Sequence, residues 1–379
     1  AAAEYPAERK IAGTGLLTVP GWQPARPVPL QDISLALSPV DGGAALVPPG
    51  PADGTGYLRY SDAVRELAAP AIFEDRPTYR LTGAELAGPA PRLGFTRGRY
   101  FDGIDTGEAA AHEYAARQLP GRPAAAGSAP DDRPSPARPS PAGSAPDDRP
   151  SPAGSSPARP SPARLSSPLA SLRGRLGDPC DLGRRPVNLA ISTLTLRLDS
   201  STGRASFLLH WRDPAKVAHA GGLYQVIPVG VFQPSGEAAW NERADFSLWR
   251  SMIREFAEEL RGRSEDYDSE NRPIDYHSWR FARRMTEALD RGQIRVWCLG
   301  LGVDPLTYAT DLLAVAVIDG PVFDGLFGLN PRPNDEGRVL AVRDFAAPVI
   351  DQLVTREPVQ AAGAAVLRLA WAHRQTLTG

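Results

Sequence analysis

Three glutamates stand close together in the segment Arg254–Leu260, which reads Arg-Glu-Phe-Ala-Glu-Glu-Leu. If this segment is a helix, Glu255, Glu258 and Glu259 occupy positions i, i+3 and i+4, so their carboxylates project from one face. Crowded carboxylates repel one another, and a divalent cation removes that repulsion. Hard cations such as Mg²⁺ prefer carboxylate and water oxygens. The spacing therefore predicts a cation site, with a solvated acidic surface as the alternative interpretation.

The residues around the glutamates favour a helix that lies against a sheet. From Asp245 to Leu260 the apolar residues recur with helical periodicity and gather on the side opposite the carboxylates. These apolar residues are Phe246, Leu248, Trp249, Ile253, Phe256 and Leu260. Arg254, at the start of the acidic turn, can hold a carboxylate through two parallel hydrogen bonds.

Strands and further helices are expected on both sides of this helix. Alternating or continuous apolar runs predict the strands, and helical periodicity predicts the helices. The expected strands are Val187–Leu198, Ala205–Trp211, Gly222–Gln233, Ile294–Leu301 and Leu312–Ile318, and the expected helices are Ser278–Leu289, Ala347–Val354 and Val359–Gln375. Strands that interleave with helices in one region predict an α/β (α+β) fold, with a mixed sheet flanked by helices.

The acidic segment resembles the second half of the Nudix box. That motif reads Gly, five residues, Glu, seven residues, then Arg-Glu-apolar-x-Glu-Glu-x-Gly-apolar, and Arg254, Glu255, Phe256, Glu258 and Glu259 match it in register. The preceding segment 223–236 is similar to the family's entry strand and its Gly/Pro-rich loop. The resemblance begins near Val187 and implies a Nudix-like fold for the C-terminal part of the chain.

The first half of the box departs from the family pattern. Gly236 and Glu242 have the expected separation, but eleven residues rather than seven lie between Glu242 and Arg254. In strict register from Arg254, Phe246 takes the glutamate position. Arg261 stands at the closing glycine, with Gly262 one residue later.

The resemblance implies a Mg²⁺-dependent (or Mn²⁺-dependent) hydrolase of a nucleoside diphosphate derivative or related diphosphate. Glu258 and Glu259 would be the principal metal ligands, Glu255 a third ligand or the base, and Arg254 the orienting catalytic residue. The altered box leaves a second function open: a non-catalytic ligand-sensing or partner-binding domain of a transcriptional regulator. The implied partner is a nucleotide-like or diphosphate small molecule, and a second copy of the chain is a further candidate.

Composition narrows the function classes. The chain has 379 residues and a net charge of −2, so bulk charge does not indicate a nucleic-acid partner. No apolar run is long enough to span a membrane. Cys180 and Cys298 are far apart and form no metal-binding motif. A reduced, cytoplasmic protein is expected.

The first residues, Ala1–Glu4, include no initiator Met, which is compatible with a fragment that lacks an upstream module.

The chain divides by composition into three parts. Residues 119–167 are rich in Pro, Ser, Ala, Arg and Asp, and the sequence AGSAPDDRPSPA at Ala126–Ala137 recurs at Ala142–Ala153. This stretch has almost no large apolar side chains, so it is expected to be a disordered linker, with docking of a partner through its prolines as the alternative. Residues 1–118 form a less regular N-terminal region of unassigned role, and residues 168–379 form the Nudix-like domain.

Two short elements are expected in the N-terminal region. A helix is predicted near Gly107–Leu119, with Asp105 and Glu108 in capping-box spacing. Short strands are predicted at Thr78–Leu81 and Arg99–Phe101. His210 and His219, farther along the chain, match no metal motif, and the expectation is one packed and one exposed histidine.

Overall fold

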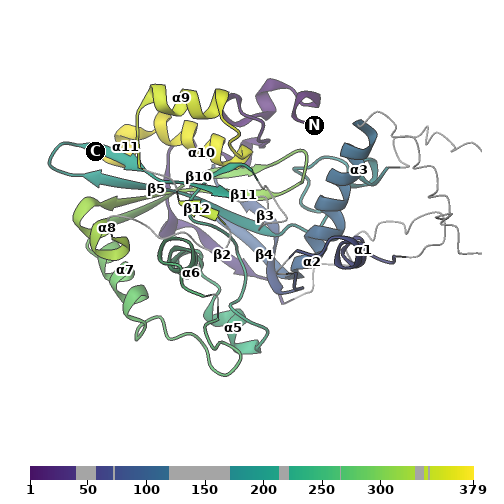
Figure 1. Cartoon of the computed structure of the whole chain (residues 1–379), viewed down its shortest axis with the longest axis horizontal. Helices are drawn as coiled ribbons and strands as arrows, with labels where there is room; N and C mark the ends of the chain where they lie inside the picture. Colours follow the sequence, from purple (N-terminus) through teal and green to yellow (C-terminus); the bar gives the residue numbers. More distant parts are fainter. Residues whose placement is uncertain are drawn as a thin grey trace, which may run out of the picture.

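The computed structural model describes residues 1–39, 57–70, 73–118, 171–212, 222–264, 266–328, 337–339 and 342–379 (Figure 1). The predicted linker at residues 119–167 lies outside the described residues, as does His219.

A mixed sheet forms the centre of the molecule. Its strands follow the order β1-β10-β11-β5-β6-β13, and β9 pairs with β5 beside this path. β11 runs parallel to β5, whereas the pairs β1–β10, β10–β11, β5–β6, β5–β9 and β6–β13 are antiparallel. The strands are β1 Val28–Pro29, β5 Leu189–Asp199, β6 Arg204–Phe207, β9 Val229–Val231, β10 Ile294–Val303, β11 Thr310–Asp319 and β13 Arg343–Asp344.

The central strands are buried on both faces, which explains their nearly continuous apolar sequence. Along β11, successive side chains point to opposite faces of the sheet. Leu312, Ala314 and Ala316 belong to one core. Leu313, Val315 and Val317 belong to the other.

Helices cover both faces of this sheet (Figure 1). On one face lie α6 Leu248–Arg261, α7 Arg280–Asp290 and α8 Gly320–Phe327, and on the other lie α9 Ala347–Arg356, α10 Ala361–Ala372 and α11 Arg374–Thr378. The predicted α/β class, a mixed sheet flanked by helices, is confirmed. α5 Ala239–Ala244 lies just before α6 in sequence.

Residues 1–118 share a core with the C-terminal part. They form a sheet of order β2-β4-β3, with β2 Ser34–Leu37, β3 Pro77–Glu85 and β4 Arg92–Arg99, together with α1 Tyr60–Leu67, α2 Tyr100–Gly103 and α3 Ala109–Gln118. The backbone N–H groups of Tyr79 and Leu81 in β3 donate to the carbonyls of Phe232 and Val187. Phe95 of β4 is fully buried in the same core as Phe256 of α6. The two parts are therefore packed together through backbone and side-chain contacts.

Two local predictions need correction in the C-terminal part. The strand expected at Ala205–Trp211 is two strands, because β6 stays in the central sheet while β7 Leu209–Arg212 joins a second sheet of order β12-β7-β8. β12 is Gly337–Val339 and β8 is Tyr224–Val226. The run at 222–233 is also divided, because β8 pairs in the second sheet whereas β9 pairs with β5 of the central sheet.

In the N-terminal region, the strand expected at Arg99–Phe101 is wrong beyond Arg99, where the chain turns into α2. A π-helical turn, Ile104–Glu108, joins α2 to α3. Asp105 therefore lies inside a helix and does not cap one. Its carboxylate accepts a hydrogen bond of 2.7 Å from the backbone N–H of Ser61 and links α1 to this turn. None of the described helices is both long enough and apolar enough to cross a membrane.

Candidate functional site

Helix α6 carries the acidic turn and is defined by clear end signals. Ser247 caps its N-terminus by accepting a hydrogen bond from the backbone N–H of Arg250. Gly262 ends it in the left-handed conformation with φ 62°, which glycine adopts without a steric penalty. The apolar side, including Ile253 and Phe256, is buried in the core. This packing fixes the direction in which the acidic face points.

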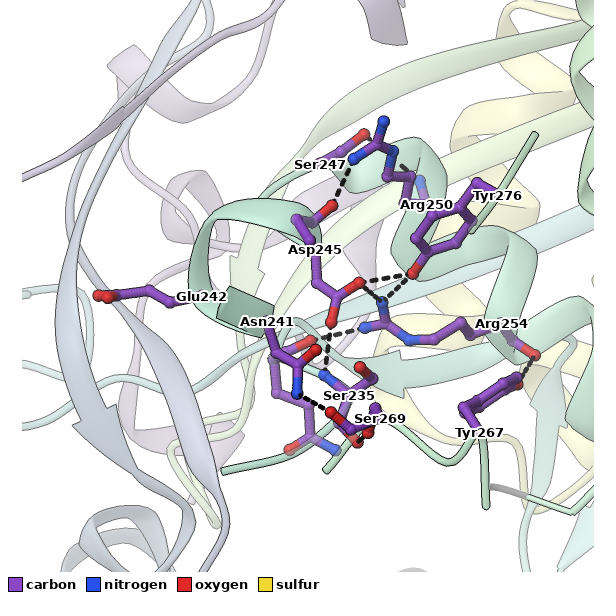
Figure 2. A network of polar contacts seen from close by, with 12 residues as sticks. Ser235, Asn241, Glu242, Asp245, Ser247, Arg250, Arg254, Tyr267, Ser269 and Tyr276 are labelled. Carbon is purple, nitrogen blue, oxygen red and sulfur yellow. Dashed lines mark hydrogen bonds and ion pairs between the residues drawn. The ribbon is translucent and has the colours of Figure 1, made fainter. Parts of the chain in front are cut away.

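Arg254 lies at the centre of a buried polar network (Figure 2). Its guanidinium donates to the Tyr276 hydroxyl at 2.7 Å and to the backbone carbonyl of Gln233 at 2.6 Å, and it lies 3.2 Å from an oxygen of Asp245. Tyr276 donates its own proton to the same Asp245 oxygen at 2.7 Å. The side chain of Asp245 is fully buried and that of Arg254 is 5% exposed.

The network joins α6 to the loop that follows β9. Asp245 accepts a hydrogen bond of 2.8 Å from the backbone N–H of Ser235, two residues after the carbonyl that Arg254 binds. Burial alone would lower the pKa of Arg254, but Tyr276 and Asp245 outweigh it, so the pKa is raised and the charge is held. Burial and the carboxylate of Asp245 raise the pKa of Tyr276, although Arg254 opposes them.

Glu259 is the most enclosed of the three glutamates. One carboxylate oxygen accepts a hydrogen bond of 2.7 Å from the backbone N–H of Val229 in β9. The other lies 3.6 Å from Nδ1 of His210 on β7, and the side chains of His210 and Glu259 are only 1% and 7% exposed. Glu259 therefore connects α6 with both β9 and the second sheet.

Glu255 is half-buried and packs directly on the backbone of β9. A Cβ atom placed on Gly230 would come within 3.0 Å of the Glu255 carboxylate, closer than carbon atoms of real side chains approach. Gly230 is thus the residue that allows this carboxylate to lie against the strand.

Glu258, also half-buried, is oriented by Tyr267 from the loop after α6. The Tyr267 hydroxyl donates to a Glu258 oxygen at 2.6 Å. Burial, followed by the neighbouring charge of Glu258, raises the pKa of Tyr267, so the phenol stays protonated and can serve as this donor.

The donor chemistry of the acidic turn fits a hard divalent cation. Mg²⁺ is commonly bound by one or two carboxylates, with water and substrate phosphates as the other ligands. Within the described ranges, no three acidic, histidine or cysteine side chains come together as a ready-made metal site. A cation at the acidic turn therefore stays a prediction from the sequence.

The Gly236–Glu242 spacing does not bring Glu242 to this site. Glu242 points away from the network (Figure 2) and forms two contacts with Arg97 of β4, at 2.6 and 3.0 Å. Asp245, three residues later, is the carboxylate that contacts Arg254.

Four further residues of the site escaped prediction from the sequence. Asp245 was assigned only to the helix, and no motif or periodicity marks Tyr267 or Tyr276. His210 was expected to match no metal motif, and the structure buries it beside Glu259. A signal was present for one of them, because Asp245 precedes the helix cap Ser247, where a carboxylate commonly anchors a loop.

Among known proteins, similarity is found to solved structures. No protein-family model matches the chain, and neither does any curated protein. A solved structure of a NUDIX hydrolase from Alicyclobacillus acidocaldarius is similar at 16% identity with a TM-score of 0.30, covering 51% of this chain and 95% of that one.

Proposed function

We propose that this chain is a divalent-cation-dependent hydrolase of a diphosphate-containing small molecule, acting at the acidic turn of α6. The observation that supports it most is the position of the three glutamates. Glu255 and Glu258 are half-buried and Glu259 is buried, so the turn is not a solvated surface. Burying like charges so close together costs free energy, which a bound cation would offset.

The residues that would hold the cation are Glu258 and Glu259, with Glu255 as a further ligand or base. Tyr267 and the backbone N–H of Val229 orient the first two carboxylates, as outer residues commonly do for metal ligands. A bound Mg²⁺ or Mn²⁺ would stabilise charge on phosphoryl oxygens and lower the pKa of a bound water. Arg254 acts as a positioning residue, because it holds the loop carbonyl of Gln233 against the helix.

A second candidate is a domain that binds such a ligand without hydrolysing it. The observation that favours it is that the carboxylates already have roles within the protein, since Glu259 binds Val229 and Glu242 is paired with Arg97. In that case the acidic turn chiefly fixes the helix to β9, and ligand binding serves sensing or partner recognition.

Turnover separates the two candidates. The full chain is assayed with ADP-ribose and other nucleoside diphosphate derivatives, with Mg²⁺ or Mn²⁺ and with a chelator. We expect cation-dependent product release that Glu258→Gln lowers at least tenfold, while Glu287→Gln on the exposed side of α7 leaves it unchanged. If the same compounds raise the melting temperature of the protein but no product forms, the non-catalytic binding domain is supported. Equal turnover by Glu258→Gln and the wild type would reject the hydrolase.

A further inference from the structure

Four exposed arginines gather where α6 ends and α7 begins. This arginine patch consists of Arg261, Arg263, Arg280 and Arg284. In the described part of the chain, none of the four has a carboxylate within ion-pair distance. In contrast, Arg283 and Arg291 both contact Glu287 on the same helix. Burial, and then the charges of the other three arginines, lower the pKa of Arg261, as expected for cations that are close together.

Aromatic rings lie within the arginine patch. The Arg263 guanidinium carbon is 4.7 Å from the ring centroid of Trp279 and 5.1 Å from that of Tyr267. The Tyr267 and Trp279 rings are themselves 5.5 Å apart. Arg261 lies 4.9 Å from the Phe281 ring in the same way. Flat guanidinium groups stacked on aromatic rings occupy the place that a nucleobase can take.

The start of α7 adds to the positive potential of the patch. Arg280 is the first residue of this helix, and the first turn holds no acidic residue. Basic residues at the positive end of a helix dipole are unfavourable, whereas an anion bound there is favourable. This arrangement costs stability in the unliganded protein and would be relieved by a phosphate group.

We propose that the arginine patch binds the phosphates of a nucleoside polyphosphate, whose base stacks on Trp279 and Tyr267. Guanidinium groups match phosphate oxygens through paired hydrogen bonds, and the aromatic rings supply a sequence-independent surface for the base. This site adjoins the cation site proposed at the acidic turn, because the Tyr267 hydroxyl donates to Glu258. It needs no divalent ion.

A mononucleotide fits the surroundings better than a nucleic acid does. The loop between α6 and α7 presents exposed carboxylates at Asp266, Asp268, Glu270 and Asp275. An extended polyanion would pass more of these carboxylates than a single nucleotide would, so they repel the polyanion more strongly. The net charge of −2 also gives the chain no long-range attraction for nucleic acid.

Calorimetry on the full chain in EDTA tests the proposal, with ATP, tripolyphosphate, adenosine and a single-stranded oligonucleotide as probes. We expect ATP to bind more tightly than tripolyphosphate or adenosine. Arg263→Gln combined with Arg280→Gln should weaken ATP binding at least tenfold. Trp279→Leu should reduce ATP affinity to that of tripolyphosphate.

The matched control replaces two paired arginines elsewhere, Arg204→Gln with Arg291→Gln, and should change ATP affinity less than twofold. Because EDTA removes divalent cations, ATP binding under these conditions does not depend on the cation site, so failure of the cation site and failure of this site give different results. Absence of ATP binding in EDTA, or an equal loss in the control, overturns the proposal. An oligonucleotide that binds more tightly than ATP through the same arginines overturns the assignment to nucleotides.

Discussion

At the scale of single residues, Arg254 belongs to the predicted motif and also stabilises the fold through a buried polar network. Its guanidinium contacts Asp245, Tyr276 and the carbonyl of Gln233 in a site almost without solvent. A buried ion pair is costly to break, because removal of one partner leaves the other charge desolvated and uncompensated. The sequence predicted an orienting role for Arg254. The structure adds the partner, Asp245, through which it holds the loop.

Replacement of Arg254 by Met should therefore lower the free energy of unfolding by roughly 3–5 kcal/mol. The double variant Arg254→Met with Asp245→Asn should lose less than the sum of the two single changes, because both act on one interaction. Urea denaturation followed by fluorescence measures this. Arg97→Gln, which breaks a more exposed ion pair, serves as control and should cost about 1 kcal/mol or less. Equal losses for Arg254→Met and Arg97→Gln would contradict the buried network.

The burial of Cys298 can be tested through the pH dependence of the unfolding free energy. Burial raises the pKa of its thiol to about 12, from an ordinary value of 9.0. The stabilisation from keeping this thiol neutral is complete below the unfolded pKa and is lost as the pH rises toward the folded pKa. The unfolding free energy should therefore fall between about pH 9 and pH 12, and less steeply in Cys298→Ala. Reaction of Cys298 with a thiol reagent in the native protein at pH 8 would contradict this burial.

At the scale of elements, the close approach of α6 to β9 depends on one glycine. Gly230→Ala would place a methyl group where the Glu255 carboxylate lies and force this carboxylate away from the strand. We expect a loss of roughly 1–3 kcal/mol in unfolding free energy, which Glu255→Ala in the same chain should partly restore. Gly83→Ala in β3 is the matched control, because its added methyl meets nothing within 4 Å. A Gly230→Ala protein as stable as the Gly83→Ala protein would show that the contact is absent.

The helices and strands could largely be predicted from the sequence, whereas the pairing of strands and the contacts of side chains could not. Apolar periodicity predicted β5, β10, β11 and α6 within a few residues, because the three strands are largely buried and α6 buries one side. It did not separate β6 from β7, since both are apolar and only their pairing in different sheets divides them. Similarly, the separation of Gly236 and Glu242 predicted that Glu242 is the glutamate in the first half of the box. In the structure, the carboxylate of Glu242 instead forms an ion pair with Arg97.

At the scale of the whole molecule, the N-terminal region and the C-terminal part are packed into one core. β1 pairs with β10, and Leu17, Trp22 and Phe95 are buried with residues of α6 and β10. The division of the chain at residues 118 and 168 was drawn from composition, which carries no information about these contacts. The sequence carries no local signal for pairing across such a distance.

The consequence is that residues 168–379 alone should not fold cooperatively. Without residues 1–118, the fragment would expose the apolar face that Trp22 and Phe95 cover. We expect it to show weak near-ultraviolet circular dichroism and a broad thermal transition, and to regain native signals when residues 1–118 are added as a second chain. A sharp, two-state transition of the fragment alone would contradict the shared core and support an independent C-terminal domain.

The central proposal, a cation held at the acidic turn of α6, is tested most directly by Mn²⁺ binding followed by electron paramagnetic resonance. The measurement uses the full chain with methylenediphosphonate, a diphosphate that cannot be hydrolysed. We expect one Mn²⁺ bound per chain, with an affinity that Glu258→Gln lowers at least tenfold and Glu287→Gln does not change. Mn²⁺ that stays unbound in the wild type, or binds equally well to Glu258→Gln, would contradict the proposal.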